Sequence, residues 1–236
     1  MKYFILVTFM VITVNSSGQE VFHLSKINEG GTTLNKAWKF HAGDDPNWAR
    51  PDLDDSKWED TDPTLELHHL PKVREAEIGW FRLTMNVDSS LTNESLTMIT
   101  TVLGAAEIYL NGQLIYKFGT VSKEYKNEQT RFIPDHLLSL KLGPQTTQVF
   151  AVRYSFNKQN FYLKFTNERP VLSIQLKESN QALVDHIKDD EFDSTLRSIQ
   201  SSFYLPLGFL LLFLYYSFRL QKEYLYSGIF CFCLFL

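Results

Sequence analysis

Alternating apolar and polar residues dominate the chain between residues 81 and 176. Residues 81–87 (FRLTMNV) alternate for seven positions, and residues 95–102 (SLTMITTV) repeat the pattern. Neighbouring side chains on a strand point to opposite faces, so this period of two predicts half-buried strands. Further strands are predicted at residues 106–110, 113–118, 149–154 and 171–176.

Turn chemistry separates these strands. Asn111-Gly112 lies between two strand-like runs, and a type I′ hairpin turn requires positive φ at both central residues. We interpret this dipeptide as a turn and not as a site. Residues 133–138 (IPDHLL) predict a short helical turn entered through Pro134. Many short strands, frequent turns and no long helix before residue 180 predict an all-β fold, a β-sandwich or jelly roll.

The hydrophobic pattern changes after residue 180. Residues 181–198 carry a broken apolar stripe at helical spacing, which predicts a helical linker. Residues 199–218 are mostly apolar and long enough to cross a bilayer as one helix. A polar turn follows at 219–223, and a second apolar run at 224–236 predicts the truncated start of a second transmembrane helix. We therefore expect the chain to be the front end of a larger membrane protein.

The first 18 residues predict a secretory signal peptide, 1–18. Lys2 gives a basic start, residues 3–14 form an apolar core, and small residues precede position 19. The alternative is an uncleaved anchor, for which this apolar core is short. Arg219 and Lys222 in the polar turn favour a cytoplasmic location of that turn. We therefore expect residues 19–180 to lie in the bacterial periplasm, tethered to the inner membrane.

The composition of the exported range limits its partners and its means of stabilisation. Cys231 and Cys233 both lie in the last apolar run, so a hydrophobic core and not a disulfide must hold the domain. Outside the signal peptide and the polar turn, acidic residues exceed basic ones by six, which argues against nucleic acid as a partner. The large aromatic residues that we expect in the core are Trp38, Phe40 and Trp58.

An ordered series of motifs resembles the sugar-binding domain of family 2 glycosidases, a galactose-binding-like jelly roll. The series is W-K-F at 38–40, D-D-S-K-W at 54–58, L-P at 70–71, G-W-F-R at 79–82 and I-Y-L-N-G at 108–112. With the signal peptide and the consecutive apolar runs, the chain resembles bacterial seven-transmembrane receptors with diverse intracellular signalling modules. That resemblance implies a periplasmic sensor with a cytoplasmic output, such as a histidine kinase or a phosphatase, which this sequence does not contain.

Two loops are the expected place for a ligand. Sugars are recognised by aromatic faces and by polar groups on loops between strands. Trp48 could instead pack over the edge of the sandwich, and Arg131 could be a salt-bridge partner. The candidate binding residues are Trp48 and Arg50 in the 44–52 loop, and Tyr125, Gln129 and Arg131 in the 119–131 loop.

Two groups of residues raise the question of a metal. Asp54 and Asp55 could help to hold a structural calcium ion, which requires several oxygen ligands, or could cap a turn. His68-His69 is the one histidine doublet in the sequence. If both residues lie on a strand, their side chains point to opposite faces and cannot chelate one ion together.

The sequence contains no recognisable catalytic signature. A glycosidase needs two carboxyl groups roughly 5–10 Å apart across a cleft, and no spacing here singles out such a pair. We therefore expect this chain to be non-catalytic, with structural calcium as the one cofactor to consider. Three interpretations stay open: a sensor that binds a glycan or another small polar molecule, an interaction module that forms a homodimer, and an anchored carbohydrate-processing protein.

Overall fold

The computed structural model describes residues 21–124, 127, 129, 131–156, 169–218 and 222–235. The predicted signal peptide, Tyr125 and residues 219–221 of the polar turn lie outside the described residues. The chain forms two compact units, Met1–Lys177 and Glu178–Leu236, which we call the β domain and the helical unit.

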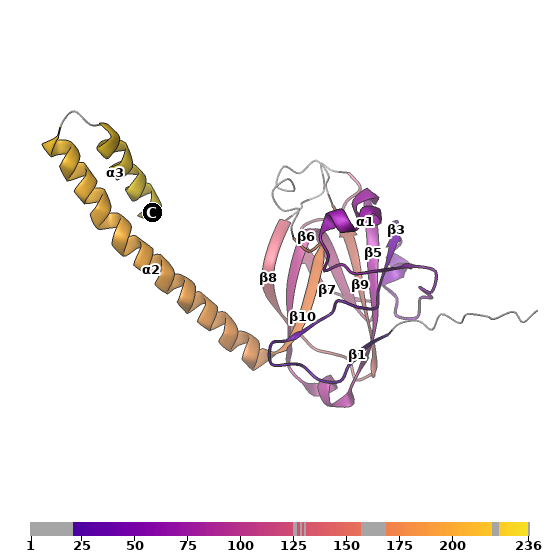
Figure 1. The fold of residues 1–236 in the computed structure, drawn as a ribbon. Helices are drawn as coiled ribbons and strands as arrows, with labels where there is room; N and C mark the ends of the chain where they lie inside the picture. The colour runs from indigo at the N-terminus through magenta and orange to yellow at the C-terminus, as the bar shows by residue number, and fades with distance from the viewer. Residues whose placement is uncertain are drawn as a thin grey trace, which may run out of the picture. The chain divides into compact units, whose positions relative to one another are not determined.

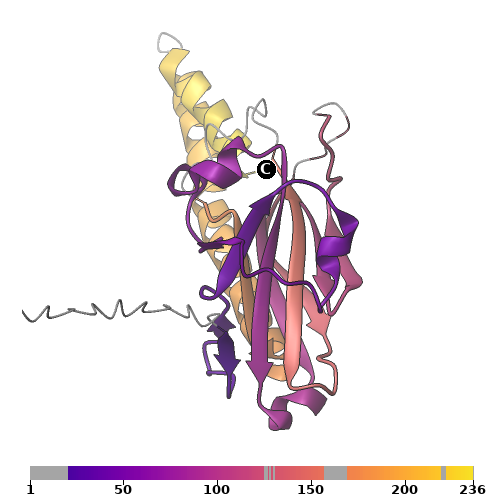
Figure 2. The same cartoon turned by 90° about the vertical axis from the view of Figure 1, so that its right-hand side faces the viewer.

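The described part of the β domain is an all-β fold with a curled, mainly antiparallel sheet (Figures 1 and 2). The strand order is β2-β10-β6-β9-β5-β3-β4, with β1 added to β5 and with β7 and β8 added to β6. Only the β1–β5 pair is parallel among the described strand pairs. The strands are β1 (Phe22–Leu24), β2 (Thr32–Thr33), β3 (Trp38–Ala42), β4 (Glu59–Thr61), β5 (Ile78–Val87), β6 (Leu96–Leu110), β7 (Gln113–Phe118), β8 (Arg131–Leu140), β9 (Thr147–Ser155) and β10 (Leu172–Glu178).

Strand β6 joins the two sides of the curled sheet. Its first part pairs with β8, and its last part pairs with β9 and β7. The sequence pattern predicted two separate strands here, because alternation is interrupted around Gly104. That glycine has a φ of 134°, a conformation that a side chain would strain, so the strand changes direction without ending.

One continuous hydrophobic core fills the space inside the sheet, and Trp38 and Phe40 are buried in it as predicted. Trp58 packs elsewhere, with Trp48, against Trp80 on the outer face of β5. From Leu83 to Val87 the burial of β5 alternates as predicted, whereas Arg82 and the residues before it are all buried. Residues 44–58 cover the outer face of β5. The alternation of apolar and polar residues in β5 could not predict this cover.

The helical turn predicted at 133–138 is wrong. These residues belong to β8, which pairs with β6 and has a register irregularity between Thr100 and Val102. Asp135 adopts a φ of 44° at this irregularity, and Thr101 Oγ1 donates to its carboxylate at 3.1 Å. Pro134 is tolerated because β8 pairs with a single described strand, so its missing amide breaks no second ladder.

Short helices and a tight turn connect described strands of the β domain. Asn111 and Gly112 have φ values of 52° and 82° between β6 and β7, which confirms the predicted turn. The helices are the 3₁₀ helices η1 (Pro46–Ala49), η2 (Leu67–His69) and η3 (Ser89–Asn93), and the α-helix α1 (Pro71–Glu75).

The helical unit is a hairpin of α2 (Ser179–Ser217) and α3 (Lys222–Phe235). A Cβ atom on Gly228 would lie 3.1 Å from Leu212 and 3.3 Å from the carbonyl oxygen of Gly208, so small residues permit the close approach. Within the described residues, α2 alone is long and apolar enough to cross a membrane, judged by length and composition. Helix α3 has 14 residues, fewer than a span requires.

Candidate functional site

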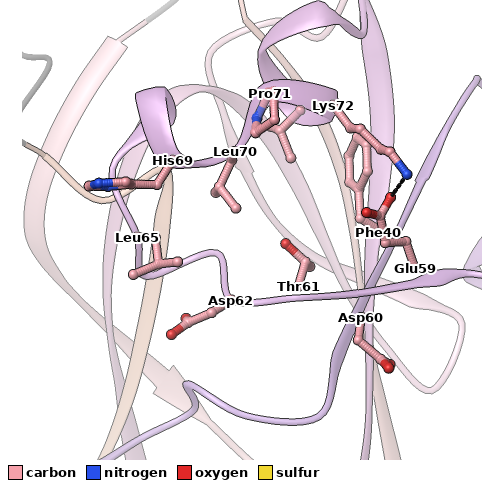
Figure 3. Close-up of a pocket in the computed structure, with 11 residues that line it drawn as sticks. Phe40, Glu59, Asp60, Thr61, Asp62, Leu65, His69, Leu70, Pro71 and Lys72 are labelled. Carbon is pink, nitrogen blue, oxygen red and sulfur yellow. Dashed lines mark ion pairs between the residues drawn. The ribbon is translucent and has the colours of Figure 1, made fainter.

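A pocket of about 300 Å³ opens beside β4, where the chain continues through η2 into α1 (Figure 3). We call it the β4 pocket. Its volume falls at the lower end of the range for small-molecule sites. The residues that line it are Phe40, Glu59, Asp60, Thr61, Asp62, Leu65, His69, Leu70, Pro71, Lys72 and Val73.

The β4 pocket has an apolar floor and a polar rim. Phe40, Leu70 and Val73 are buried and form the apolar side. Figure 3 shows Lys72 and Glu59 paired near Phe40 at one end, and His69 beside Leu65 at the other. Such a lining can bury an apolar face of a small molecule while rim groups bond to its hydroxyl or charged groups.

The ion pair at the rim is exposed, so a group of a bound ligand can readily replace one of its two partners. Lys72 Nζ lies 2.6 Å from Glu59 Oε2, and the two side chains are 68% and 47% exposed. Pairs of this kind stabilise a protein by at most about 1 kcal/mol because water competes for both ions. A polar ligand could therefore replace one partner at little energetic cost.

Backbone hydrogen bonds fasten the pocket segment, residues 62–66, to the start of β10. The amides of Val171 and Leu172 donate to the carbonyl oxygens of Leu65 and Pro63 at 3.1 and 2.9 Å. Glu66 forms a β-bridge with Pro170. The pocket wall and β10 are therefore one hydrogen-bonded unit.

The predicted binding residues of the 44–52 loop contact neighbouring side chains. The Trp48 ring packs edge-on against His41 and Trp58, with centroid distances of 4.8 and 5.3 Å. The Arg50 side chain pairs with Asp52, at 2.6 Å between Nη2 and Oδ2. The alternative in which Trp48 packs over the sheet is therefore the one that the geometry favours.

The second predicted loop is only partly described. Gln129 is exposed and forms an isolated β-bridge with Thr120. Arg131 lies on β8 opposite Gly104, and its side chain, like Tyr125, is outside the described residues. Among the described contacts, none joins Gln129 to Trp48 or Arg50.

The calcium site suggested for Asp54 and Asp55 does not fit the structure. Asp54 accepts the Ser56 amide at 3.0 Å, which is turn capping. The Asp55 carboxylate is buried between two cations: Arg82 Nε at 3.0 Å and Lys39 Nζ at 3.5 Å. A dication would have to displace both cations, so we assign Asp55 a structural role.

A second ionic network, which the sequence did not indicate, lies around Arg153. Its guanidinium binds Asp44 twice, at 2.6 and 2.8 Å, and Glu107 at 3.1 Å. The hydrogen bonds from Arg153 hold the pKa of Asp44 below its usual value. Burial and the neighbouring Glu107 raise the pKa of Tyr109 to about 12. These charges compensate one another, so the network fastens residue 44 to β9 and β6.

No sequence signal pointed to the β4 pocket. Its residues come from β3, β4, η2, α1 and the segments that connect the last three, and the pocket exists because η2 and α1 pack beside the β3–β4 edge. The acidic run Glu59-Asp60-Thr61-Asp62 is ordinary for an exposed edge strand. The sequence feature that comes closest to indicating the pocket is the histidine doublet His68-His69 directly before Leu70-Pro71.

No protein-family model matches the sequence, and no curated protein matches it. Solved structures with some likeness include a β-glucuronidase of Bacteroides uniformis (18% identity, TM-score 0.44, 61% of this chain and 17% of that chain). A β-glycosidase of Bacteroides vulgatus (18%, 0.42, 63% and 20%) and a β-glucuronidase of Bifidobacterium dentium (12%, 0.41, 67% and 32%) are also similar. The chain spans about a fifth of the length of the first two. At these values the likeness does not assign the chain to a family.

Proposed function

We propose that this chain is the ligand-sensing, membrane-anchored part of a signalling receptor. In this proposal the β domain, a galactose-binding-like jelly roll exported behind a signal peptide, faces the periplasm of a bacterium. It binds a small polar molecule in the β4 pocket, with carbohydrates as the expected class. The apolar floor and the ionised, hydroxyl-bearing rim support this choice, because sugars present both hydroxyl groups and apolar faces.

One observation carries the proposal: the pocket segment is hydrogen-bonded to the strand that continues into the apolar helix. Leu65 and Pro63 accept hydrogen bonds from Val171 and Leu172 at the start of β10. Helix α2 begins directly after β10, with no loop between them. A ligand that shifts residues 62–66 would therefore act directly on the backbone of β10.

Signalling through this connection requires two receptor states. A ligand can change their populations only if its affinity for the two states differs. The proposal assigns the output to a cytoplasmic module such as a histidine kinase, and it assigns no catalytic role to the β domain.

A thermal-shift screen of the intact chain in detergent tests the proposal. All four tryptophans lie between residues 38 and 80, so intrinsic fluorescence reports the β domain. A compound present at 100 times its Kd should stabilise the domain by about 2.7 kcal/mol. We expect at least one glycan or polar metabolite to raise the melting temperature.

Matched variants locate the binding site. Asp60→Asn and Thr61→Ala, in the β4 pocket, should abolish the shift, whereas Arg50→Ala and Gln129→Ala should leave it intact. If no compound stabilises the protein, the sensor proposal is wrong. If the loop variants remove the shift and the pocket variants do not, the binding site lies in the loops.

A homodimerisation module is the second candidate, favoured by exposed apolar residues on α2. Leu183, Val184, Ile187 and Leu196 are between 42% and 57% exposed. Two copies packed along this stripe would bury these side chains, as in a coiled coil. Light scattering on the screened sample separates the candidates, because a stable dimer that responds to no compound favours the module.

A further inference from the structure

Glu66, His68 and His69 bring three metal-ligating side chains together at one end of the β4 pocket. One ligand atom from each residue lies within 4.8 Å of the ligand atoms of the other two. Nδ1 of His68 lies 3.1 Å from Oε2 of Glu66. The centroids of the two imidazole rings are 3.8 Å apart.

The 3₁₀ geometry of η2 creates this cluster. The sequence-based argument that His68 and His69 cannot share an ion assumed a strand, and that assumption is wrong. Glu66 is the N-cap residue of η2 and has an extended backbone, with a φ of −70° and a ψ of 149°. The His69 amide donates to the Glu66 carbonyl oxygen at 2.9 Å, and this tight turn keeps both imidazoles close to the Glu66 carboxylate.

The turn is held firmly while its imidazoles stay accessible. Leu67 and Leu70 are buried and anchor η2 in the core, whereas His68 and His69 are exposed. The β-bridge between Glu66 and Pro170 fixes the start of the turn to the sheet region. The described contacts of the His69 ring include no hydrogen bond and no ion pair, so its nitrogens are available to an ion.

We propose that Glu66, His68 and His69 form a site for a divalent transition-metal ion, with Zn²⁺ as the expected occupant. Zn²⁺ binds imidazole nitrogen and carboxylate oxygen at about 2.0–2.2 Å and prefers four tetrahedral ligands. Tetrahedral ligand atoms at these bond lengths are about 3.4 Å apart, so a modest rotation of exposed side chains closes the cluster. Ca²⁺ and Mg²⁺ prefer oxygen ligands and fit two imidazoles poorly.

Two imidazoles and one carboxylate leave the fourth position of a tetrahedral ion to water or to another oxygen ligand. His69 also lines the β4 pocket, so an ion here stands at the pocket rim. The metal site does not depend on the proposed sensor function, because an ion that only stabilised η2 would bind to the same three ligands.

Isothermal titration of the intact chain in detergent with ZnCl₂ tests the site. The protein is purified with a tag that contains no histidine, stripped with a chelator and dialysed. We expect one Zn²⁺ per chain with a Kd in the micromolar range or tighter. Co²⁺ should bind with visible absorption bands typical of four-coordinate nitrogen and oxygen ligation.

Variants identify the ligands. His68→Ala, His69→Ala and Glu66→Gln should each weaken Zn²⁺ binding at least 10-fold, and the double variant H68A/H69A should abolish it. His23→Ala, at an exposed position on β1, should keep the stoichiometry and affinity of the unaltered chain. Tryptophan fluorescence melts without metal check that each variant is folded.

Two results would overturn the site: no Zn²⁺ binding by the unaltered chain, or unchanged affinity in H68A/H69A. If the histidine variants fail to fold, Glu66→Gln decides, because glutamine preserves the size of the side chain. Unchanged Zn²⁺ affinity in a folded E66Q protein contradicts the three-ligand site, and a loss of at least 10-fold supports it.

Discussion

Asp55 and Arg82 form a buried ion pair that fastens residues 44–58 to the outer face of β5. Arg82 Nε lies 3.0 Å from Asp55 Oδ2, and the two side chains are 1% and 3% exposed. Nη1 of Arg82 also donates to the carbonyl oxygens of Trp48 and Arg50, at 2.6 and 3.0 Å. The Arg82 guanidinium thus fixes the 44–52 loop, where the sequence predicted that Trp48 and Arg50 contact a ligand.

Asp55→Asn should destabilise the β domain strongly. The change leaves Arg82 buried without its counter-charge, and breaking a buried pair in this way costs about 3–5 kcal/mol. Urea unfolding of the intact chain, followed by tryptophan fluorescence, measures the loss. Asp52→Asn is the matched control, since it breaks the exposed pair with Arg50 and should leave the unfolding midpoint nearly unchanged. Equal losses in both variants would contradict the role of Asp55.

Gly104→Ala should destabilise the fold where β6 changes direction. The new Cβ would lie 2.6 Å from the carbonyl oxygen of Ser155, at a φ of 134° that alanine adopts poorly. We expect a loss of about 2 kcal/mol or more in the free energy of unfolding. Gly30→Ala is the control, because no atom lies within 4 Å of its added Cβ. A G104A protein as stable as G30A would show that β6 is not constrained at this point.

The Arg153 network should make stability depend on acidic pH. Hydrogen bonds from Arg153 lower the pKa of Asp44 below its ordinary 3.8. The pKa of Glu107 is also lowered, because bonds to Lys117 and Arg153 outweigh the opposite effect of burial. A carboxylate whose pKa is lower in the folded state stabilises the fold above its unfolded-state pKa, and this contribution disappears as the pH falls through the folded-state pKa.

Arg153→Gln should therefore lower the melting temperature at neutral pH, and the difference from the unaltered chain should shrink from about pH 4 downward. Fluorescence melts across this range give the measurement. Arg74→Gln, at an exposed position on α1, should show no comparable difference at any pH. A difference for R153Q that is constant from neutral to acidic pH would rule out the ionic origin.

Leu210→Arg should weaken membrane anchoring. Leu210 lies in the apolar part of α2, and an arginine near the centre of a span costs about 2.5–3.5 kcal/mol on insertion. Leu183→Arg is the control, because Leu183 has a similar exposure on the polar part of the same helix. Alkaline washing of membranes should release more of L210R than of L183R. Equal retention of both variants would argue against α2 as the anchor.

Several elements of the β domain could be predicted from local pattern alone. Alternation identified β5, β9 and β10 to within a few residues, and Asn111-Gly112 identified the β6–β7 turn. The β8 strand was not predicted, because Pro134 favours the start of a helix locally. Pairing with β6 makes these residues a strand. Local preferences are weak, and a partner strand outweighs them.

The sequence by itself determined where β5, β7, β9, β10 and the apolar helix lie, because side-chain periodicity follows from backbone geometry within a few residues. Only the tertiary structure decided that Arg82 is buried, that Asp55 is its partner and not a calcium ligand, and that the pocket lies beside β4. It also decided that Glu66, His68 and His69 lie close together. These relationships depend on which distant segments pack together, and no local period records that choice.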